Sequence, residues 1–514
     1  MEVIDAWLNV NRNRTAPHNI IDLNRLDDAN ELCAPILMDE VKQLVMRNPR
    51  KAPGASLIGR DILIHFPDSL IQSMTDLYNA SLSTGYFPSR FKSAIAALIP
   101  KPNKDLTNPK NYRPISLLET IGKFFEKIIN RRLRRYFDDN DLISSKQFGF
   151  RSHRSTQDVL NILTNYCSMN KDKRLTTILV TKDVEKAFDT VWHAALKYKI
   201  WRNFNLPPCI AKLLCNFLDN RTMQVKFKNV ISENFPLHAG VPQGSSISPT
   251  LYTMYTNDLP DPTYPDSITI QYADDCTQLV RFRQHTGVVK RVNKELTFVT
   301  RWEHKWRVKT NPEKTKVLII QPTGRLVRFD PIYLDTYDRN KIPLNRATQV
   351  NVLGLIFDQK LNFGPHATQK INIARSALYG LYRFRGSASK TKLHLYKALI
   401  RPLLTYAALT LSILTPTNRK KFQIVQNKAL RWVYCTRWDE FITNLELHER
   451  ARLPPLNQYW RWLVWRQTDR LAEWCPDWTE FFHRVQRGFG GDRVANNLLE
   501  LDWQSGVEPV FGSR

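Results

Sequence analysis

The stretch SITIQYADDCTQLV, Ser267 to Val280, decides the fold of this chain. Two runs of strand-forming residues, Ile268 to Tyr272 and Thr277 to Val280, flank Ala273-Asp274-Asp275-Cys276. The pattern predicts a tight β-hairpin with two adjacent carboxylates at its turn. An Asp-Asp pair is also common in ordinary turns, because aspartate bonds its own backbone there. The rest of the chain must therefore decide between a turn and a site.

A third carboxylate follows another predicted strand. Thr176 to Val180, TTILV, reads as a buried strand, and Asp183 lies just beyond it, with helical periodicity from Glu185 to Leu196. A carboxylate in this position is either a site residue or a helix cap. Adjacent carboxylates repel each other unless a cation lies between them and a third group, and oxygen ligands suit magnesium. We expect Asp183 to meet Asp274 and Asp275 around magnesium.

Composition favours a polyanionic partner. The 514 residues carry 75 Lys plus Arg against 48 Asp plus Glu, a formal net charge of +27. Such a charge attracts nucleic acid or acidic lipid. No run of eighteen or more apolar residues and no amino-terminal signal peptide is present, so we expect nucleic acid and no membrane.

The seven cysteines are scattered, without paired zinc spacing. This pattern predicts reduced thiols, most of them small core residues, and excludes a disulfide scaffold.

The first half of the chain alternates helical and extended segments. Residues 1–34 predict a poorly determined leader, and helical periodicity begins near Pro35 and ends at the Pro-Gly break of residues 51–54. Residues 62–82 predict a second helix, and residues 91–98 a strand. Lys101 and Arg113 follow on what reads as irregular, proline-punctuated backbone, where solvated cations are the common alternative to phosphate ligands.

Two further segments have nucleic-acid-binding character. Residues 121–137 predict a basic amphipathic helix, which is equally consistent with a packed surface helix. Residues 147–151, QFGFR, form an aromatic and cationic loop that could contact a strand by stacking and charge. Residues 239–249, AGVPQGSSISP, form a small-residue loop that opens a helix over residues 250–258, a place where backbone can approach an anion closely.

The second half becomes helical. Residues 287–308 predict an amphipathic helix, residues 317–320 a strand, and residues 352–357 part of a strand pair. Basic helical segments follow at residues 367–384, 390–414 and 417–434, typical of a helical bundle. The Trp-rich stretch of residues 459–465 is expected to pack rather than to form a stacking platform.

Nine motifs in this order resemble the reverse transcriptase family, specifically that of non-LTR (LINE-type) retrotransposons of the jockey-like group. They are KAPG (51–54), IPKP (99–102), NYRPISLL (111–118), QFGFR (147–151), DVEKAFDTVWH (183–193), AGVPQGSSISP (239–249), YADD (272–275), NPEKT (311–315) and VLGLIFD (352–358). Each match is weak by itself, whereas the collinear set, within a likeness over roughly residues 35–434, is specific.

The resemblance implies an α+β right-hand polymerase with fingers, a palm with an antiparallel sheet, and a helical thumb. It implies that Asp183 and Asp274 bind two Mg²⁺ ions, for which Mn²⁺ could substitute, and that Asp275 supports them. Its implied nucleotide-binding residues are Lys101, Arg113, Phe188, which would block a ribose 2′-hydroxyl, Gln243, Gly244 and Lys314. Its implied template and primer contacts are Gln147, Phe148, Gly149 and Arg151, with Leu353 and Gly354 at the primer grip.

The implied activity is RNA-directed DNA synthesis, extending a DNA 3′-hydroxyl on an RNA template during target-primed retrotransposition. The implied partners are template RNA, primer or target DNA, and deoxynucleoside triphosphates, in a ribonucleoprotein of nucleus and cytoplasm. We expect a truncated or separate polymerase portion, since the leader is too short for the endonuclease of full elements and the tail lacks a ribonuclease H pattern.

The expected domains are a leader (1–34), an amino-terminal extension and fingers (35–155), a palm (156–358), a thumb (365–450) and a Trp-rich tail (451–514). The reverse transcriptase domain as a whole would span about residues 82–358.

Two positions depart from the family pattern. Lys182 precedes the first aspartate where relatives are apolar, and strand alternation directs it towards packed helices, where an unpaired lysine costs several kcal/mol. Ser56 lies in a segment where relatives usually carry an acidic residue. These departures leave a catalytically silent nucleic-acid-binding relic as an alternative. An RNA-templated RNA polymerase is a third reading, which Phe188 disfavours.

Overall fold

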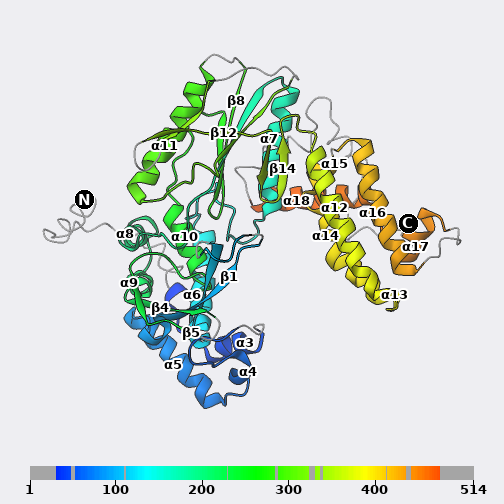
Figure 1. Ribbon diagram of the computed structural model, residues 1–514. Coiled ribbons are helices and arrows are strands. Elements are labelled where there is room, and N and C mark those ends of the chain that lie inside the picture. The colour runs from blue at the N-terminus through cyan, green and yellow to red at the C-terminus, as the bar shows by residue number, and fades with distance from the viewer. Residues whose placement is uncertain are drawn as a thin grey trace. The chain divides into compact units, whose positions relative to one another are not determined.

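The computed structural model describes residues 31–47, 52–102, 104–108, 111–227, 230–283, 287–322, 330–335, 340–412, 414–435 and 442–474 (Figure 1). The chain divides into two compact units: unit 1 comprises Met1–Asn140 and Ile200–Leu237, and unit 2 comprises Asp141–Lys199 and His238–Arg514. Residues 1–30 of the predicted leader and residues 475–514 of the predicted tail lie outside the described residues. The predicted domain bounds stay a prediction.

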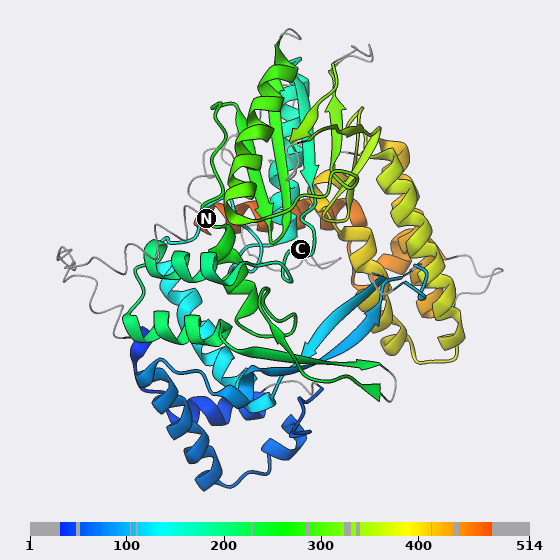
Figure 2. The ribbon, with the colours of Figure 1, turned by 60° about the vertical axis from the view of Figure 1, so that its left-hand side comes forward.

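Unit 1 combines helices with a mixed sheet. Strand β1 pairs antiparallel with β2 and parallel with β4, which also pairs with β5 and β6. Figure 2 shows the blue β1–β2 hairpin, of which β1 lies beside the green strand β4, more than a hundred residues later in the chain. The elements are α3 (Met38–Arg47), α4 (Arg60–Leu63), α5 (Asp68–Thr84), β1 (Ser93–Pro100), β2 (Tyr112–Leu117), α6 (Thr120–Asp139), α9 (Pro208–Leu218), β4 (Arg221–Phe227), β5 (Val230–Ile231) and β6 (Phe235–Leu237).

The β1–β2 hairpin corrects one expectation. Arg113 lies within β2, opposite Ile99, and not on irregular backbone. Pro114 is tolerated because β2 is an edge strand, where a residue without an N–H breaks no ladder on its open side. Lys101 lies just beyond β1, where its N–H donates to the Asn111 carbonyl at 2.8 Å.

Ser56, which lies in the segment that departs from the family pattern, contacts the carboxylate of Glu119 in unit 1. Both the hydroxyl and the N–H of Ser56 donate to Glu119. A side chain on Gly54 would collide with the backbone of Glu119, because its Cβ would lie 2.7 Å from the Glu119 nitrogen. Ser56 is therefore part of a close packing of this loop against the start of α6.

Unit 2 is built on a five-stranded sheet in the order β12-β9-β3-β8-β7. Strand β3 is central and pairs antiparallel with β8 and β9, and β7 and β8 form the predicted hairpin. Its sheet elements are β3 (Thr176–Lys182), β7 (Ser267–Tyr272), β8 (Asp275–Phe282), β9 (Lys316–Ile320), β10 (Tyr333–Asp335), β11 (Lys341–Pro343), β12 (Asn345–Arg346), β13 (Gln349–Val352) and β14 (Leu355–Asp358).

Helices cover both faces of this sheet (Figure 1). Leu179 faces the core formed with α7 (Thr156–Asp172), whereas Ile178 and Val180 face the core formed with α11 (Val288–Trp306). A capping box starts α7, in which Ser155 and Asp158 exchange side-chain and backbone hydrogen bonds. Because side chains alternate along a strand, Lys182 belongs to the α11 face and Asp183 to the other.

The predicted helix over residues 185–196 is wrong in its first half. Residues 185–190 form turns, and α8 begins only at His193 and ends at Asn203. Carbonyl groups that a helix would pair internally accept hydrogen bonds from a loop distant in sequence. The Val241 N–H donates to the Phe188 carbonyl and the Gly240 N–H to the Val191 carbonyl, both at 2.8 Å. These bonds join this turn to the residues before α10 (Ser248–Thr256).

The carboxyl-terminal part of unit 2 is helical, as predicted, and shares one continuous core with α7. The predicted helix over residues 390–414 breaks at Tyr406 (ψ +133°) and Ala407 (φ +59°), and a π-helical turn precedes Pro402, which provides no N–H to the preceding turn. Trp460 and Trp462 are buried, which confirms packing. The helices are α12 (Gly364–Leu381), α13 (Ser389–Leu395), a π-helical turn (Tyr396–Ile400), α14 (Arg401–Thr405), α15 (Ala408–Ser412), α16 (Pro416–Tyr434), α17 (Asn444–Ala451) and α18 (Leu456–Trp474).

Among the described helices, none has both the length and the apolar character needed to cross a membrane.

Candidate catalytic carboxylate site

Register brings the three predicted carboxylates to one edge of the unit 2 sheet. Lys182, the last residue of β3, pairs with Cys276 of β8. One further step in this antiparallel register places Asp183 beside Asp275, and residues opposite each other in such a ladder have Cα atoms about 4.5–5.5 Å apart. Asp274 occupies the turn of the same hairpin, after Ala273 with φ +59°. The expected meeting of β3 with the hairpin is confirmed.

The charges of these side chains act on one another. Withdrawal from water by the surrounding protein raises the pKa of Asp275 to about 6, and the charges of Asp274 and Asp183 add to that rise. Burial also raises the pKa of the Tyr252 hydroxyl, with Asp274 the largest electrostatic contributor. Repulsion of this kind is what a bound cation would relieve.

A lysine already supplies a positive charge at the site. Lys314 Nζ lies 3.0 Å from Asp183 Oδ2, and both side chains are partly exposed. The Asn311 side-chain oxygen accepts from the N–H groups of Glu313 and Lys314, which shapes the turn that carries this lysine. Lys314 thus lies beside Asp183, and the pyrophosphate contact implied for it stays a prediction.

The donor set fits a hard divalent cation. Within the described residues, no three His, Cys, Asp or Glu side chains form a ready-made metal site. Carboxylate oxygens at Asp183, Asp274 and Asp275 are nevertheless the ligands that magnesium prefers, and their mutual repulsion disfavours the cation-free arrangement. Because Lys314 bonds Asp183, a metal ion would compete with its ammonium group.

The loop predicted to contact template packs against the aspartate turn. Gln147 is 1% exposed, and its side-chain oxygen accepts from the N–H groups of Ala273 at 3.0 Å and Gly149 at 2.8 Å. Phe148 is fully buried, and its N–H donates to Gln271 at 2.9 Å. These contacts bury the side chains of Gln147 and Phe148 against the aspartate turn, and the template contact implied for them stays a prediction.

The neighbouring loop residues complete the same support. A Cβ on Gly149 would lie 2.2 Å from the Ala273 nitrogen, so only glycine allows this approach. Arg151 donates to the carbonyls of Ile143 and Ser144. Template contact by Gly149 and Arg151 stays a prediction.

Phe188 lies close to the carboxylates through an aromatic stack. Its ring packs on Tyr252 of α10, with centroids 4.9 Å apart and an angle of 19° between planes, and meets Phe150 edge-on at 6.0 Å. The Tyr252 hydroxyl in turn lies within the electrostatic reach of Asp274 and Asp275. The ring predicted to select the sugar therefore stacks on a tyrosine that senses the charge of Asp274.

The loop before α10 is fastened to the turn that carries Phe188. Gln243 donates to Asp189 at 2.8 Å, and a Cβ on Gly240 would lie 2.7 Å from the Asp189 carbonyl oxygen. Gly244 adopts φ +135°, which favours glycine. The nucleotide roles of Gln243 and Gly244 stay predictions.

The remaining predicted residues lie elsewhere in the fold. Leu353 and Gly354 form the turn between β13 and β14, with φ values of +46° and +85°, and the Tyr406 hydroxyl donates to the Leu353 carbonyl. Lys101 and Arg113 belong to the β1–β2 hairpin of unit 1. The roles implied for these four residues stay predictions.

The structure answers the concern raised by Lys182. Its side chain is buried, but its Nζ lies 2.5 Å from Glu303 Oε1 on α11. An ion pair with buried partners removes the penalty of an isolated charge. The reason for expecting an impaired palm is therefore absent.

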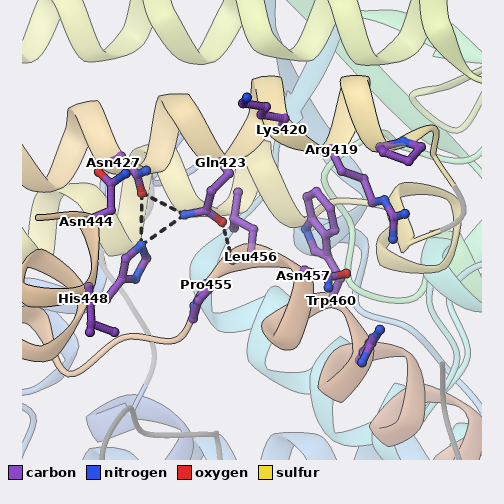
Figure 3. A pocket seen from close by; sticks show the side chains of 13 residues that line it. Arg419, Lys420, Gln423, Asn427, Asn444, His448, Pro455, Leu456, Asn457 and Trp460 are labelled. Carbon is purple, nitrogen blue, oxygen red and sulfur yellow. Dashed lines mark hydrogen bonds between the residues drawn. The ribbon is translucent and has the colours of Figure 1, made fainter. Parts of the chain in front are cut away.

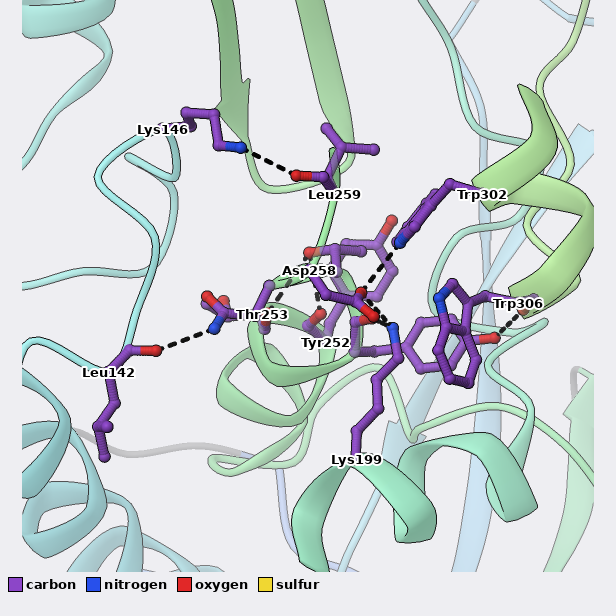
Figure 4. A network of polar contacts seen from close by, with 12 residues as sticks. Leu142, Lys146, Lys199, Tyr252, Thr253, Asp258, Leu259, Trp302 and Trp306 are labelled. Atoms are coloured by element: carbon purple, nitrogen blue, oxygen red, sulfur yellow. Dashed lines mark hydrogen bonds and ion pairs between the residues drawn. The ribbon is translucent and has the colours of Figure 1, made fainter. Parts of the chain in front are cut away.

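A second buried lysine escaped the sequence analysis. Lys199 of α8 donates to Asp258 and to the Tyr255 carbonyl, both at 2.5 Å. Figure 4 shows Lys199 directed at Asp258 between Trp302 and Trp306. Its Nζ lies 3.9 Å from the Trp306 ring centroid, and Trp302 donates to Asp258 at 3.0 Å. Burial lowers the pKa of Lys199 to about 8, and Asp258 opposes that change. The cluster fastens α8 and α11 to the end of α10; only the scattered tryptophans could have signalled it.

A separate pocket of about 760 Å³ lies among α16, α17 and α18. Arg419, Lys420 and Arg461 line it together with Trp460. Figure 3 shows that Gln423, Asn427 and His448 close one side through mutual hydrogen bonds. Cations beside amides in a hollow suit a phosphate-bearing ligand.

Comparison with known proteins agrees with the motifs. The family model described as "Reverse transcriptase (RNA-dependent DNA polymerase)" matches residues 99–357, half of the chain. The RNA-directed DNA polymerase from mobile element jockey of Drosophila melanogaster is 29% identical over 458 residues, covering 85% of this chain and 48% of that protein. The probable RNA-directed DNA polymerase from transposon X-element of the same species is 29% identical, covering 80% and 45%. The chain spans about half the length of these curated relatives.

Two solved telomerase structures from Candida tropicalis are also similar. One, an apo form truncated from its C-terminal domain, has 14% identity and a TM-score of 0.36, covering 57% of this chain and 59% of that one. The other, in complex with a fragment of telomeric RNA, has 13% identity and a TM-score of 0.39, covering 81% and 68%.

Asp275→Asn should stabilise the metal-free protein near neutral pH. Because the folded-state pKa of Asp275 is raised, the folded protein binds a proton that the unfolded chain has lost between about pH 6 and 4, so wild-type stability rises as pH falls through that window. Because the Asp275 side chain is still in contact with water, we expect the substitution to raise the free energy of unfolding by only about 1 kcal/mol at pH 7.5. Urea unfolding in a chelator should show this gain at pH 7.5, about half of it at pH 5 and almost none by pH 4; a gain equal at all three values would contradict the assignment.

Proposed function

Because the chain belongs to the reverse transcriptase (RNA-dependent DNA polymerase) family, we propose that it extends a DNA 3′-hydroxyl on an RNA template with deoxynucleotides. The observation that carries the proposal is the convergence of Asp183 with Asp274 and Asp275 at one sheet edge, where burial, together with the charges of the other two carboxylates, raises the pKa of Asp275. The similarity to retrotransposon polymerases supports the same reading and favours target-primed retrotransposition as its setting.

The carboxylates would hold two Mg²⁺ ions, or Mn²⁺ in their place. Bound there, the ions supply charge that lowers the pKa of the primer 3′-hydroxyl and neutralises the leaving pyrophosphate. The protein then needs mainly to align the reacting groups and to stabilise the charge that develops on them, because phosphoryl transfer leaves little covalent chemistry to side chains. Lys314, released from Asp183 when cations bind, would be free to approach the pyrophosphate.

Rigid packing around the carboxylates supports this alignment. Gln147 fixes the backbone of the aspartate turn, and Phe188 is fixed by Tyr252. Groups held before substrate arrives do not have to be ordered during reaction. We propose that Phe188 excludes the ribose 2′-hydroxyl and so selects deoxynucleotides.

The cationic pocket of α16, α17 and α18 is proposed to contact the nucleic-acid backbone. Arg419, Lys420 and Arg461 all line it, and the net charge of +27 favours a polyanion throughout. Location of the protein in nucleus and cytoplasm as a ribonucleoprotein stays a prediction.

Primer extension tests the main proposal. Wild-type protein with an RNA template, a DNA primer, deoxynucleotides and Mg²⁺ should yield extended product, whereas Asp274→Asn should bind the duplex equally well and lose on the order of a thousandfold in rate. Asp261→Asn, which changes an exposed aspartate elsewhere in unit 2, is the control. Well-folded wild-type protein that makes no product would favour the silent relic, and full activity of Asp274→Asn would refute the site.

Phe188→Val should relax sugar selection. Removing the bulk beside the catalytic edge should lower the preference for deoxynucleotides over ribonucleotides by about 10- to 100-fold, mainly by improving ribonucleotide use. Single-nucleotide incorporation measures the two kcat/KM values. Phe298→Val, on the exposed side of α11, is the matched control. An unchanged ratio in Phe188→Val would remove the selector role, and equal use of both sugars by wild-type protein would revive the RNA polymerase alternative.

Neutralising the pocket should weaken nucleic-acid binding. In Arg419→Gln/Lys420→Gln/Arg461→Gln, the slope of log affinity against log salt should fall by up to about 3, one unit for each lost phosphate contact. Lys390→Gln/Lys421→Gln/Lys428→Gln removes the same charge from exposed positions outside the pocket. Fluorescence anisotropy across a salt series would measure both; equal changes would show a general charge effect rather than a pocket contact.

A further inference from the structure

A buried polar network lies directly behind the first catalytic aspartate. Glu303 Oε1 on α11 accepts from Lys182 Nζ at 2.5 Å and from the Thr310 hydroxyl at 2.8 Å. All three residues are less than a tenth exposed. One carboxylate oxygen thus joins the end of β3 to the segment that follows α11.

The two joined segments carry functional residues immediately beyond the network. Val184 and Thr310 form an antiparallel bridge, the Asp183 carbonyl accepts from Asn311 N–H at 2.8 Å, and Glu185 N–H donates to Lys309 at 2.7 Å. Asp183 follows Lys182 by one residue, and Lys314 follows Thr310 by four. Lys314 Nζ lies 3.0 Å from Asp183 Oδ2.

From this arrangement we infer that Lys182, Glu303 and Thr310 are positioning residues for Asp183 and Lys314. This inference rests on the proposed polymerase function. The network aligns the strand that bears the metal-binding carboxylate with the turn that bears its lysine partner. Lys182 is then a working part of the palm and not a defect in it.

Charge and burial explain why the network acts as one unit. Lys182 and Glu303 neutralise each other, but removing either one leaves an isolated buried charge. Thr310 uses its hydroxyl to fix the second segment to the same oxygen. Loss of the hydroxyl alone would leave the ion pair intact and release only the alignment of the two segments.

Thr310→Val is therefore the sharpest test, because it changes no charge and little volume. Thr300→Val is its matched control: Thr300 is equally buried on α11, but its hydroxyl donates to Leu296 and not to Glu303. Lys182→Met/Glu303→Leu tests the ion pair with an apolar replacement that avoids an isolated charge.

Hydrogen–deuterium exchange of the Glu185 and Asn311 amides reports the alignment without requiring activity. We expect faster exchange at both amides in Thr310→Val and in the double variant, and wild-type exchange in Thr300→Val. Mn²⁺ binding, measured by titration calorimetry with Mn²⁺ alone, should weaken by about tenfold in the same two variants. Primer extension should then show a lower kcat at saturating deoxynucleotide with an unchanged KM.

The outcomes separate this inference from the proposed function. Wild-type exchange and Mn²⁺ affinity in both Thr310→Val and the double variant would overturn the positioning role, as would equal losses in Thr310→Val and Thr300→Val. If wild-type protein fails to extend primers while exchange changes as expected, the alignment stands and the polymerase function fails.

Discussion

Repulsion between carboxylates is the constraint on which this structure depends. Asp183 follows one strand, and Asp274 and Asp275 come from a hairpin; burial raises the pKa of Asp275, and the negative charges of Asp274 and Asp183 raise it further. Such an edge persists only if the surrounding backbone is held firmly. A divalent cation turns the same repulsion into attraction, which is why an arrangement that costs stability can be retained for catalysis.

The rigidity comes from buried groups that do not themselves perform chemistry. Gln147 holds the aspartate turn through backbone hydrogen bonds, and Gly149 permits the contact because any side chain would strike Ala273. On the other face, Glu303 joins the end of β3 to the segment leading to Lys314. Lys199 and its aromatic surroundings fasten α8 and α11 to α10, which carries the tyrosine beneath Phe188. The catalytic edge is therefore supported from several independent directions.

Positive and negative side chains gather at different places in unit 2. Positive residues line the pocket of the helical part of unit 2, where a polyanion would meet them in water. At the carboxylate edge, by contrast, Lys314 balances the nearest acid at 3.0 Å. A general positive surface attracts nucleic acid, whereas local negative charge selects the cations needed for transfer.

The sequence by itself determined the hairpin, the strand before Asp183, the family and the identity of the acidic residues, because short-range periodicity and turn chemistry specify these features. Only the tertiary structure decided what each surrounding residue contacts. Residues 185–190 have helical periodicity but form turns, since the Val241 N–H donates to the Phe188 carbonyl and the Gly240 N–H to the carbonyl of Val191. Gln147 reads as an exposed contact but is buried, and Lys182 reads as an isolated charge but meets Glu303, 121 residues away. Partners so distant along the chain leave no local pattern, and packing alone brings them together.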